Sequence, residues 1–148
     1  MQKIALVTGA AGGLGRTVAD RLAREGWELI VVSRRASHLS DVFGERHLQI
    51  EADCSTVAGA REVLRVAKDK GMIPTALAHC IGNIRLSALH RMTEGDFNDC
   101  LSANLVSAFH TLAAFVGALC ATLLVQGLAS GKARWAPATT LLAGIAVN

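Results

Sequence analysis

The segment 8–15 reads Thr-Gly-Ala-Ala-Gly-Gly-Leu-Gly and has the residue types of a phosphate-binding loop. It follows an apolar run, Lys3 to Val7, and precedes an amphipathic stretch, Arg16 to Glu25. Glycines allow a tight turn and let a pyrophosphate approach the main chain. The free N–H groups at the start of the next helix then face the anion, and the helix dipole favours its charge. A strand, a glycine loop and a helix in this order predict a dinucleotide phosphate site.

Two arginines stand where a second strand would end. Ser33, Arg34 and Arg35 follow the apolar run 28–32. Arg34 lies about 20 residues after the last glycine of the loop, the spacing expected for a contact to the cofactor's ribose. An acidic residue there would bind the 2′-hydroxyl of NAD, whereas arginine accommodates the 2′-phosphate of NADP. The alternative is an exposed arginine pair without a ligand. The sequence therefore favours NADP over NAD.

Apolar runs that could form strands alternate with helical patterns along the chain. Residues 47–51 and 75–80 are the third and fourth strand candidates, and 57–70 has apolar residues at helical spacing. Thr93, with Asp96 three residues later, predicts the start of a helix that runs past Leu119. This alternation predicts an α/β fold, a doubly wound parallel sheet of strand order 3-2-1-4 with helices on both faces. A fifth strand is expected at 138–147.

The spacing of the loop, Thr-Gly-x-x-x-Gly-x-Gly, resembles the cofactor loop of the short-chain dehydrogenase/reductase family. The resemblance extends from Ile4 to about Leu119. That family has Asn-Asn-Ala-Gly after its fourth strand, where this chain has His79-Cys80-Ile81-Gly82 and keeps the glycine alone. The resemblance implies a Rossmann-like, NADP-binding domain over residues 1–119, followed by a divergent tail over 120–148. It also implies hydride transfer between NADP(H) and a small-molecule carbonyl or alcohol.

The resemblance assigns site residues as well. Asp53, which by itself reads as a turn residue or helix cap, falls where the family has an acidic residue against the adenine ring. Asn104 falls where the family has an asparagine that bends its helix and holds a water of the proton relay, and it is the catalytic residue that we predict. The predicted cofactor-binding residues are Gly9, Ala11, Gly12, Gly13, Leu14, Gly15, Ser33, Arg34, Arg35, Asp53, Cys54, Cys80, Ile81 and Gly82.

The proton-transfer residues of the family have no counterpart in this sequence. Its 148 residues contain no tyrosine, so the family's Tyr-x-x-x-Lys pair is missing. Ala143 and Gly144 occupy the position expected for the catalytic serine. A positioned proton donor contributes about 10²–10⁴ in rate. We therefore expect a truncated, frame-altered or split family member that binds NADP weakly or not at all and has no dehydrogenase turnover.

Composition argues against several other classes of function. The net charge is +3 and the basic residues are scattered, so no nucleic-acid interface is predicted. The four cysteines and five histidines lack metal-ligand spacing, so no metal site is expected. Reduced thiols, together with an N-terminal apolar run too short for a secretory signal, predict a cytoplasmic location.

A charge-free stretch from Leu101 to Gly131 allows a membrane interpretation. It exceeds the ~20 residues that cross a bilayer, and Lys132 and Arg134 follow it. Polar side chains interrupt it, and in the resembling family the corresponding helix lies against the sheet and in a subunit interface. A homo-oligomer is therefore favoured over a membrane. The alternatives left open are a non-catalytic nucleotide-binding or interaction module, half of a split enzyme completed by another chain, and a membrane-associated fragment.

Overall fold

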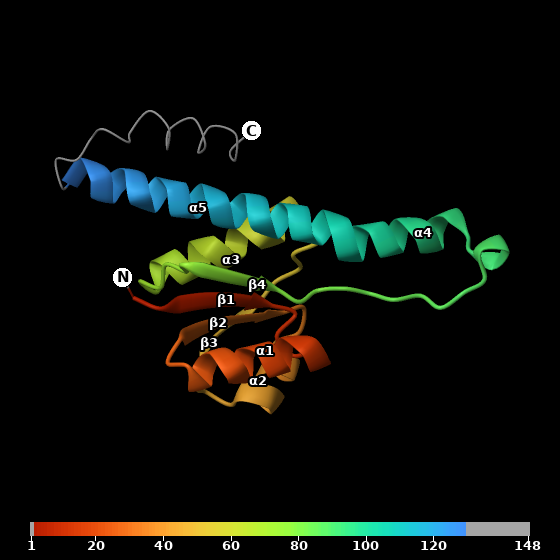
Figure 1. The fold of residues 1–148 in the computed structure, drawn as a ribbon, viewed down its shortest axis with the longest axis horizontal. Coiled ribbons are helices and arrows are strands. Elements are labelled where there is room, and N and C mark those ends of the chain that lie inside the picture. Colours follow the sequence, from red (N-terminus) through yellow and green to blue (C-terminus); the bar gives the residue numbers. More distant parts are fainter. Residues whose placement is uncertain (1, 130–148) are drawn as a thin grey trace.

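The computed structural model describes residues 2–129 (Figure 1). Four strands alternate with helices along this part of the chain. In order, the elements are β1 (Ile4–Thr8), α1 (Gly13–Arg24), β2 (Glu28–Ser33), α2 (Ala36–Phe43), β3 (Leu48–Glu51), α3 (Val57–Asp69), β4 (Ala76–His79), the 3₁₀ turn η1 (Leu89–Arg91), α4 (Glu94–Leu101), the π-helical segment η2 (Ser102–Val106) and α5 (Ser107–Ala129).

The strands form one parallel sheet of order β3-β2-β1-β4. This confirms the predicted fold class and strand order. In the register of the sheet, Val7 lies opposite Val31 on one side and Ala78 on the other. All five residues of β1 are buried, as expected for a central parallel strand that is covered on both faces. The expected fifth strand at 138–147 lies outside the described residues, as does the rest of the tail from 130.

Helices cover both faces of the sheet: α1 and α2 lie on one, α3 and α5 on the other (Figure 1). Alternate residues of each strand face the two layers. In β1, Ile4 and Leu6 pack with Phe115 of α5, whereas Val7 packs with Ala19 of α1. The period of two in a strand thus gives each layer its own buried cluster. This arrangement brings the carboxyl ends of all four strands to one edge, where the loops of a site can meet.

Two details of the helices were not predicted from the sequence. The first is α2, whose buried residues Leu39 and Phe43 are one helical turn apart. The second is the π-helical form of η2, which lies between α4 and α5 and contains Asn104, the residue at which the resemblance implies a bend. The start of α4 agrees with the prediction, because Thr93 and Asp96 form a capping box. The Thr93 amide donates to the Asp96 carboxylate at 3.1 Å, and this bond lowers the pKa of Asp96.

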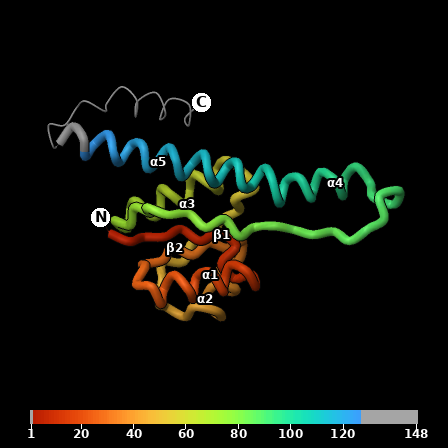
Figure 2. The backbone as a smooth tube through the Cα atoms, viewed as in Figure 1, coloured from red at the N-terminus to blue at the C-terminus, as the bar shows by residue number. Residues whose placement is uncertain are grey.

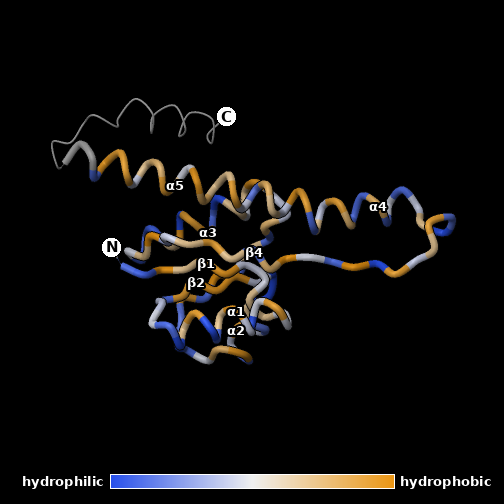
Figure 3. Tube along the Cα trace, viewed as in Figure 1, coloured by the Kyte–Doolittle hydropathy of each residue, from blue (hydrophilic) through white to orange (hydrophobic). Residues whose placement is uncertain are grey.

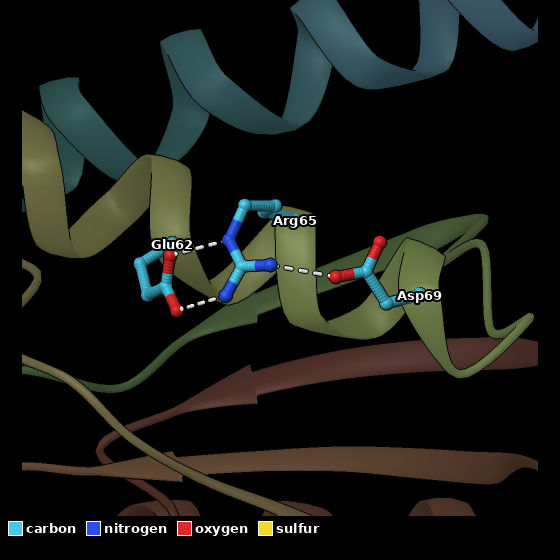
Figure 4. A network of polar contacts seen from close by, with 3 residues as sticks. All are labelled: Glu62, Arg65 and Asp69. Carbon is cyan, nitrogen blue, oxygen red and sulfur yellow. Dashed lines mark hydrogen bonds and ion pairs between the residues drawn. The ribbon is translucent and has the colours of Figure 1, made fainter.

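Charged residues gather on the outer face of α3. The guanidinium of Arg65 contacts the carboxylates of Glu62 and Asp69, each at 2.6 Å (Figure 4). All three side chains are exposed, so the network contributes little to stability. It marks this face of α3 as solvent-facing, opposite the apolar face that packs on the sheet and α5.

The chain leaves the sheet after β4 in an extended segment and returns as one long helical rod made of α4, η2 and α5 (Figure 2). Within the described residues, Glu94–Gln126 is the one helix long and apolar enough to cross a membrane, by length and composition alone. Its most apolar window has a mean hydropathy of 2.0, and 17% of that window is buried. The apolar character continues along α5 (Figure 3). This helix therefore presents a large uncovered apolar surface.

Candidate functional site

The amino end of α1 is built to receive an anion. Gly12 is its N-cap residue, no side chain caps it, and its first turn carries no acidic residue. The loop before it is closed by main-chain bonds, from the Gly12 amide to the Gly9 carbonyl at 3.0 Å and from the Arg16 amide to the Gly12 carbonyl at 2.8 Å. The first amides of a helix have no intrahelical acceptor. At α1 they remain available to a phosphate.

Two glycines of the loop are required by close main-chain packing. Gly9 has a φ of +65°, and a Cβ atom there would lie 2.7 Å from the Cys80 carbonyl oxygen. A Cβ atom at Gly15 would overlap the Gly9 carbonyl. The loop is therefore held between the end of β4 and the first turn of α1. Side chains at either position would push these elements apart.

A cavity of about 700 Å³ lies at the carboxyl edge of the sheet, beside this loop. It brings together nine of the predicted cofactor-binding residues, which come from the ends of all four strands: Gly9, Ala11, Gly12, Ser33, Arg34, Asp53, Cys80, Ile81 and Gly82. The edge where parallel strands end is where ligands bind in open α/β sheets.

The other five predicted residues do not line the cavity. Gly13, Leu14 and Gly15 form the first turn of α1, and the Leu14 side chain is 68% exposed. Arg35 is exposed at the N-cap of α2. Cys54 lies in the core, and burial raises the pKa of its thiol.

Asp53 has a local structural role at the turn that precedes α3. Its carboxylate accepts hydrogen bonds from the Ser55 amide at 3.0 Å and the Ser55 hydroxyl at 2.7 Å. These bonds lower the pKa of Asp53, and the nearby Arg34 charge lowers it further. Asp53 is therefore ionised at neutral pH, and its carboxylate lies close enough to the Arg34 guanidinium for the two charges to attract. Both side chains lie in the wall of the cavity.

Asn104 ties the segment after β4 to the helical rod. Its amide group donates to the carbonyls of Asn83 and Cys100, both at 2.8 Å, and its Oδ1 accepts from the Asn83 amide at 3.2 Å. Its bond to the Cys100 carbonyl joins η2 to the end of α4, where the regular helical bonding is interrupted. A Cβ atom at Gly82 would lie 3.0 Å from Oδ1 of Asn104. Asn104 thus shapes the cavity wall through Asn83, which lines it.

The structure adds residues to the site that sequence reasoning missed. Beside those predicted, the cavity is lined by Val32, His38, Ala52, Ser55, Asn83, Asp99, Ser102 and Ala103. Some of these residues could have been predicted because they adjoin predicted residues in the sequence, as Asn83 adjoins Gly82. His38 was not, because it reaches the site from α2. The place of Asp99 in the cavity wall depends likewise on how the helical rod packs against the sheet.

The residues present fit a dinucleotide diphosphate. The uncapped helix end offers amides, the glycine loop leaves room for a phosphate to approach, and Arg34 adds a positive charge at the cavity wall. No group of three or more His, Cys, Asp or Glu side chains in the described residues could hold a metal ion. The arrangement therefore suits an anionic organic ligand.

Comparisons with known proteins agree with this geometry. A family model described as short chain dehydrogenase matches residues 3–123. Similar curated proteins include 3-oxoacyl-(acyl-carrier-protein) reductase FabG of Escherichia coli, 31% identical over 120 residues and covering 79% of this chain and 49% of the relative. Another is 3-hydroxyacyl-CoA dehydrogenase type-2 of Drosophila melanogaster, 28% identical over 120 residues, with coverage of 74% and 46%. The chain thus spans about half the length of these relatives.

Solved structures share the fold. An alcohol dehydrogenase from Thermococcus sibiricus, solved with 5-hydroxy-NADP, superposes with a TM-score of 0.73 at 24% identity, covering 82% of this chain and 55% of that one. Ligand-free aldohexose dehydrogenase from Thermoplasma acidophilum gives 0.70 at 22% identity, with coverage of 80% and 45%. The family consists of oxidoreductases that bind a nicotinamide cofactor. Because its family model matches most of these 148 residues, the chain belongs to the short-chain dehydrogenase family.

Proposed function

We propose that this chain supplies the nucleotide-binding half of an NADP-dependent oxidoreductase that acts on a small-molecule carbonyl or alcohol. One observation carries the proposal: the uncapped end of α1 lies beside a cavity of about 700 Å³ whose wall includes Arg34. The amides of α1 would hold the pyrophosphate, and Asp53 would contact the adenine. When bound, the cofactor supplies the hydride chemistry. The residues of this chain bind and orient it.

Arg34 supports NADP rather than NAD. Its side chain is exposed at the cavity wall, and it forms no ion pair with the rest of residues 2–129. A free guanidinium suits a phosphate, with which it forms paired hydrogen bonds. The Thermococcus sibiricus relative was solved with an NADP derivative, which is consistent with this preference.

Arg34→Ala is expected to weaken NADPH binding by about 10- to 100-fold, since a hydrogen bond to a charged group contributes ~1.5–3 kcal/mol. NADH, which lacks the 2′-phosphate, should bind with unchanged affinity. Arg35→Ala is the matched control, because Arg35 lies next in sequence but outside the cavity wall. Isothermal calorimetry of the three proteins with both nucleotides makes the comparison. An equal loss for NADPH and NADH in Arg34→Ala would refute 2′-phosphate recognition.

Turnover needs a proton donor that these 148 residues do not supply, because they contain no tyrosine. Asn104 is the one residue to which we assign a catalytic-type role. Within the described residues, β4 is hydrogen-bonded to β1 alone, so its outer edge is free to pair with a further strand. We therefore propose that these residues have no dehydrogenase activity by themselves and that catalysis requires further polypeptide, in the same chain or a complementing one.

The exposed apolar side chains of the rod favour a second copy of this chain as partner. They are Phe97, Leu101, Leu105, Phe109 and Leu112, which are 38–68% exposed. These side chains recur every three or four residues and so lie along one side of the rod, which marks a candidate interface. We propose a cytoplasmic homo-oligomer, with membrane association as the competing account of the same surface.

Leu105→Glu is expected to convert the oligomer to monomer without unfolding it, because Leu105 is 64% exposed within one chain. Lys3→Gln, at the opposite end of the sheet, lowers the net charge by the same one unit and is the control for charge change alone. Sedimentation equilibrium in buffer without detergent reads the assembly state. A wild-type chain that stays in solution only with detergent would instead support the membrane account.

A further inference from the structure

A chain of polar contacts crosses the interior next to the nucleotide loop. Nδ1 of His79, the last residue of β4, lies 2.9 Å from the hydroxyl of Thr8, the last residue of β1. Nε2 of the same ring lies 3.2 Å from the hydroxyl of Ser107, the first residue of α5. Thr8 and Ser107 are fully buried. His79 therefore bridges two strands and the helical rod.

The contacts determine which ring nitrogen carries the proton. The Ser107 hydroxyl donates its single hydrogen to the Ala103 carbonyl at 2.7 Å. It can therefore only accept from the ring, so Nε2 of His79 must carry the hydrogen. Nδ1 is then the acceptor for the Thr8 hydroxyl. This neutral tautomer satisfies every member of the bridge.

Both ends of the bridge lead to the candidate site. Thr8 is followed by Gly9, whose carbonyl accepts the Gly12 amide and closes the loop before α1. Ser107 and Ala103 flank Asn104, which holds Asn83 in the cavity wall. We propose that His79 is a positioning residue whose neutral form joins the glycine loop to the Asn104 segment, and that protonation of its ring loosens both together.

The surroundings of the ring offer no compensation for a positive charge. His79 faces the α3/α5 side of the sheet, in line with Leu77, whereas the charged residues of α1 lie on the other side. The charged residues Glu62, Arg65 and Asp69 of α3 lie on its outer face, away from the sheet. The titratable groups on the ring's own side are Cys54, which is buried in the core, and His110, which bonds the Ser55 carbonyl. Cys80 follows His79 and faces α1. None of these groups is an anion at neutral pH.

Protonation disturbs the bridge at the end next to Thr8. A hydrogen on Nδ1 would make that nitrogen a donor, and the Thr8 hydroxyl would have to turn its own hydrogen away. Burial lowers the pKa of His79 below its usual 6.5. The folded chain therefore takes up fewer protons than the unfolded chain as the pH falls below 6.5. The stability that His79 contributes is full above that pH and declines as the pH falls toward its folded pKa.

Nuclear magnetic resonance of the wild-type protein tests the proposal. Ring ¹⁵N shifts at pH 7.5 should show the Nε2–H tautomer of His79, with a midpoint below 6.5. Amide shifts of Gly9 and Ser107 and the side-chain amide of Asn104 should move with the same midpoint. An Nδ1–H tautomer, or shifts confined to residue 79, would overturn the proposal.

A variant that cannot titrate isolates the effect of the ring. His79→Gln retains a side-chain amide that can donate toward Ser107, so we expect it to fold and to lose the shared midpoint at Gly9 and Asn104. Its melting temperature should fall less than that of the wild type between pH 7.5 and 5.5. Parallel pH profiles would contradict the proposal. Any effect of His79 on NADP binding rests on the proposed function. The wild-type measurement needs neither this variant nor a nucleotide, so it tests the bridge independently of that function.

Discussion

Gly12→Asp is expected to abolish NADPH binding while the fold persists. Gly12 is the N-cap of α1, and its φ of −76° and ψ of 165° suit any residue that caps a helix. An aspartate there would place a carboxylate on the amides that we assign to the pyrophosphate. Like charges about 4 Å apart repel by about 4 kcal/mol at an effective dielectric constant of about 20. Affinity should therefore fall by at least about 100-fold.

Gly12→Asn separates charge from bulk. Both side chains add a Cβ atom 3.3 Å from the Gly9 carbonyl oxygen, and both can cap the helix. We expect the asparagine variant to bind NADPH more tightly than the aspartate variant, and both to melt at or slightly above the wild-type temperature. Calorimetric titration and thermal melts measure the two effects. Equal affinities for the two variants would contradict a phosphate at the end of α1.

Gly15→Ala should lower the free energy of unfolding by about 1–3 kcal/mol, the usual cost of overpacking. Its Cβ atom would lie 2.8 Å from the carbonyl carbon of Gly9 and 2.8 Å from the Cα of Ala10, in addition to overlapping the Gly9 carbonyl oxygen. These are main-chain atoms, so no side-chain rotation can relieve the overlap. The loop or α1 must shift instead, which should weaken nucleotide binding as well.

Gly13→Ala is the control for this effect, two residues away in the same turn. A Cβ atom at Gly13 meets nothing within 4 Å, and its φ is not positive. The substitution should leave stability unchanged or raise it by ~0.4–1 kcal/mol through the unfolded state. Urea denaturation of the two variants gives the comparison. A loss of stability in Gly13→Ala as large as in Gly15→Ala would show that the close packing at Gly15 is not the cause.

The fold was predictable because its strands and most of its helices have clear local patterns. The apolar run of β1, the capping residues Thr93 and Asp96, and the helical spacing in α3 depend on neighbours in sequence. α2 is short, and only Leu39 and Phe43 mark its buried face. η2 depends on a tertiary contact, since the Asn104 amide group bonds both Asn83 and Cys100.

The site was predictable where it is built from strand ends and the glycine loop. Residues such as Gly9, Arg34 and Asp53 follow strands, and a parallel sheet brings strand ends to one edge. Residues that approach from elsewhere, such as His38 and Asp99, depend on how α2 and the rod pack. The bridge through His79 was missed for the same reason, because its partners Thr8 and Ser107 are far from it in sequence.

The account depends most directly on whether NADPH binds at the amino end of α1. Titration of ¹⁵N-labelled wild-type protein with NADPH, followed by amide shifts, measures this residue by residue. We predict saturable shifts that are largest at Gly13, Leu14 and Gly15, with smaller ones at Arg34. A folded protein that shows no shifts at millimolar NADPH, or shifts only at residues away from the cavity, would contradict the proposed function.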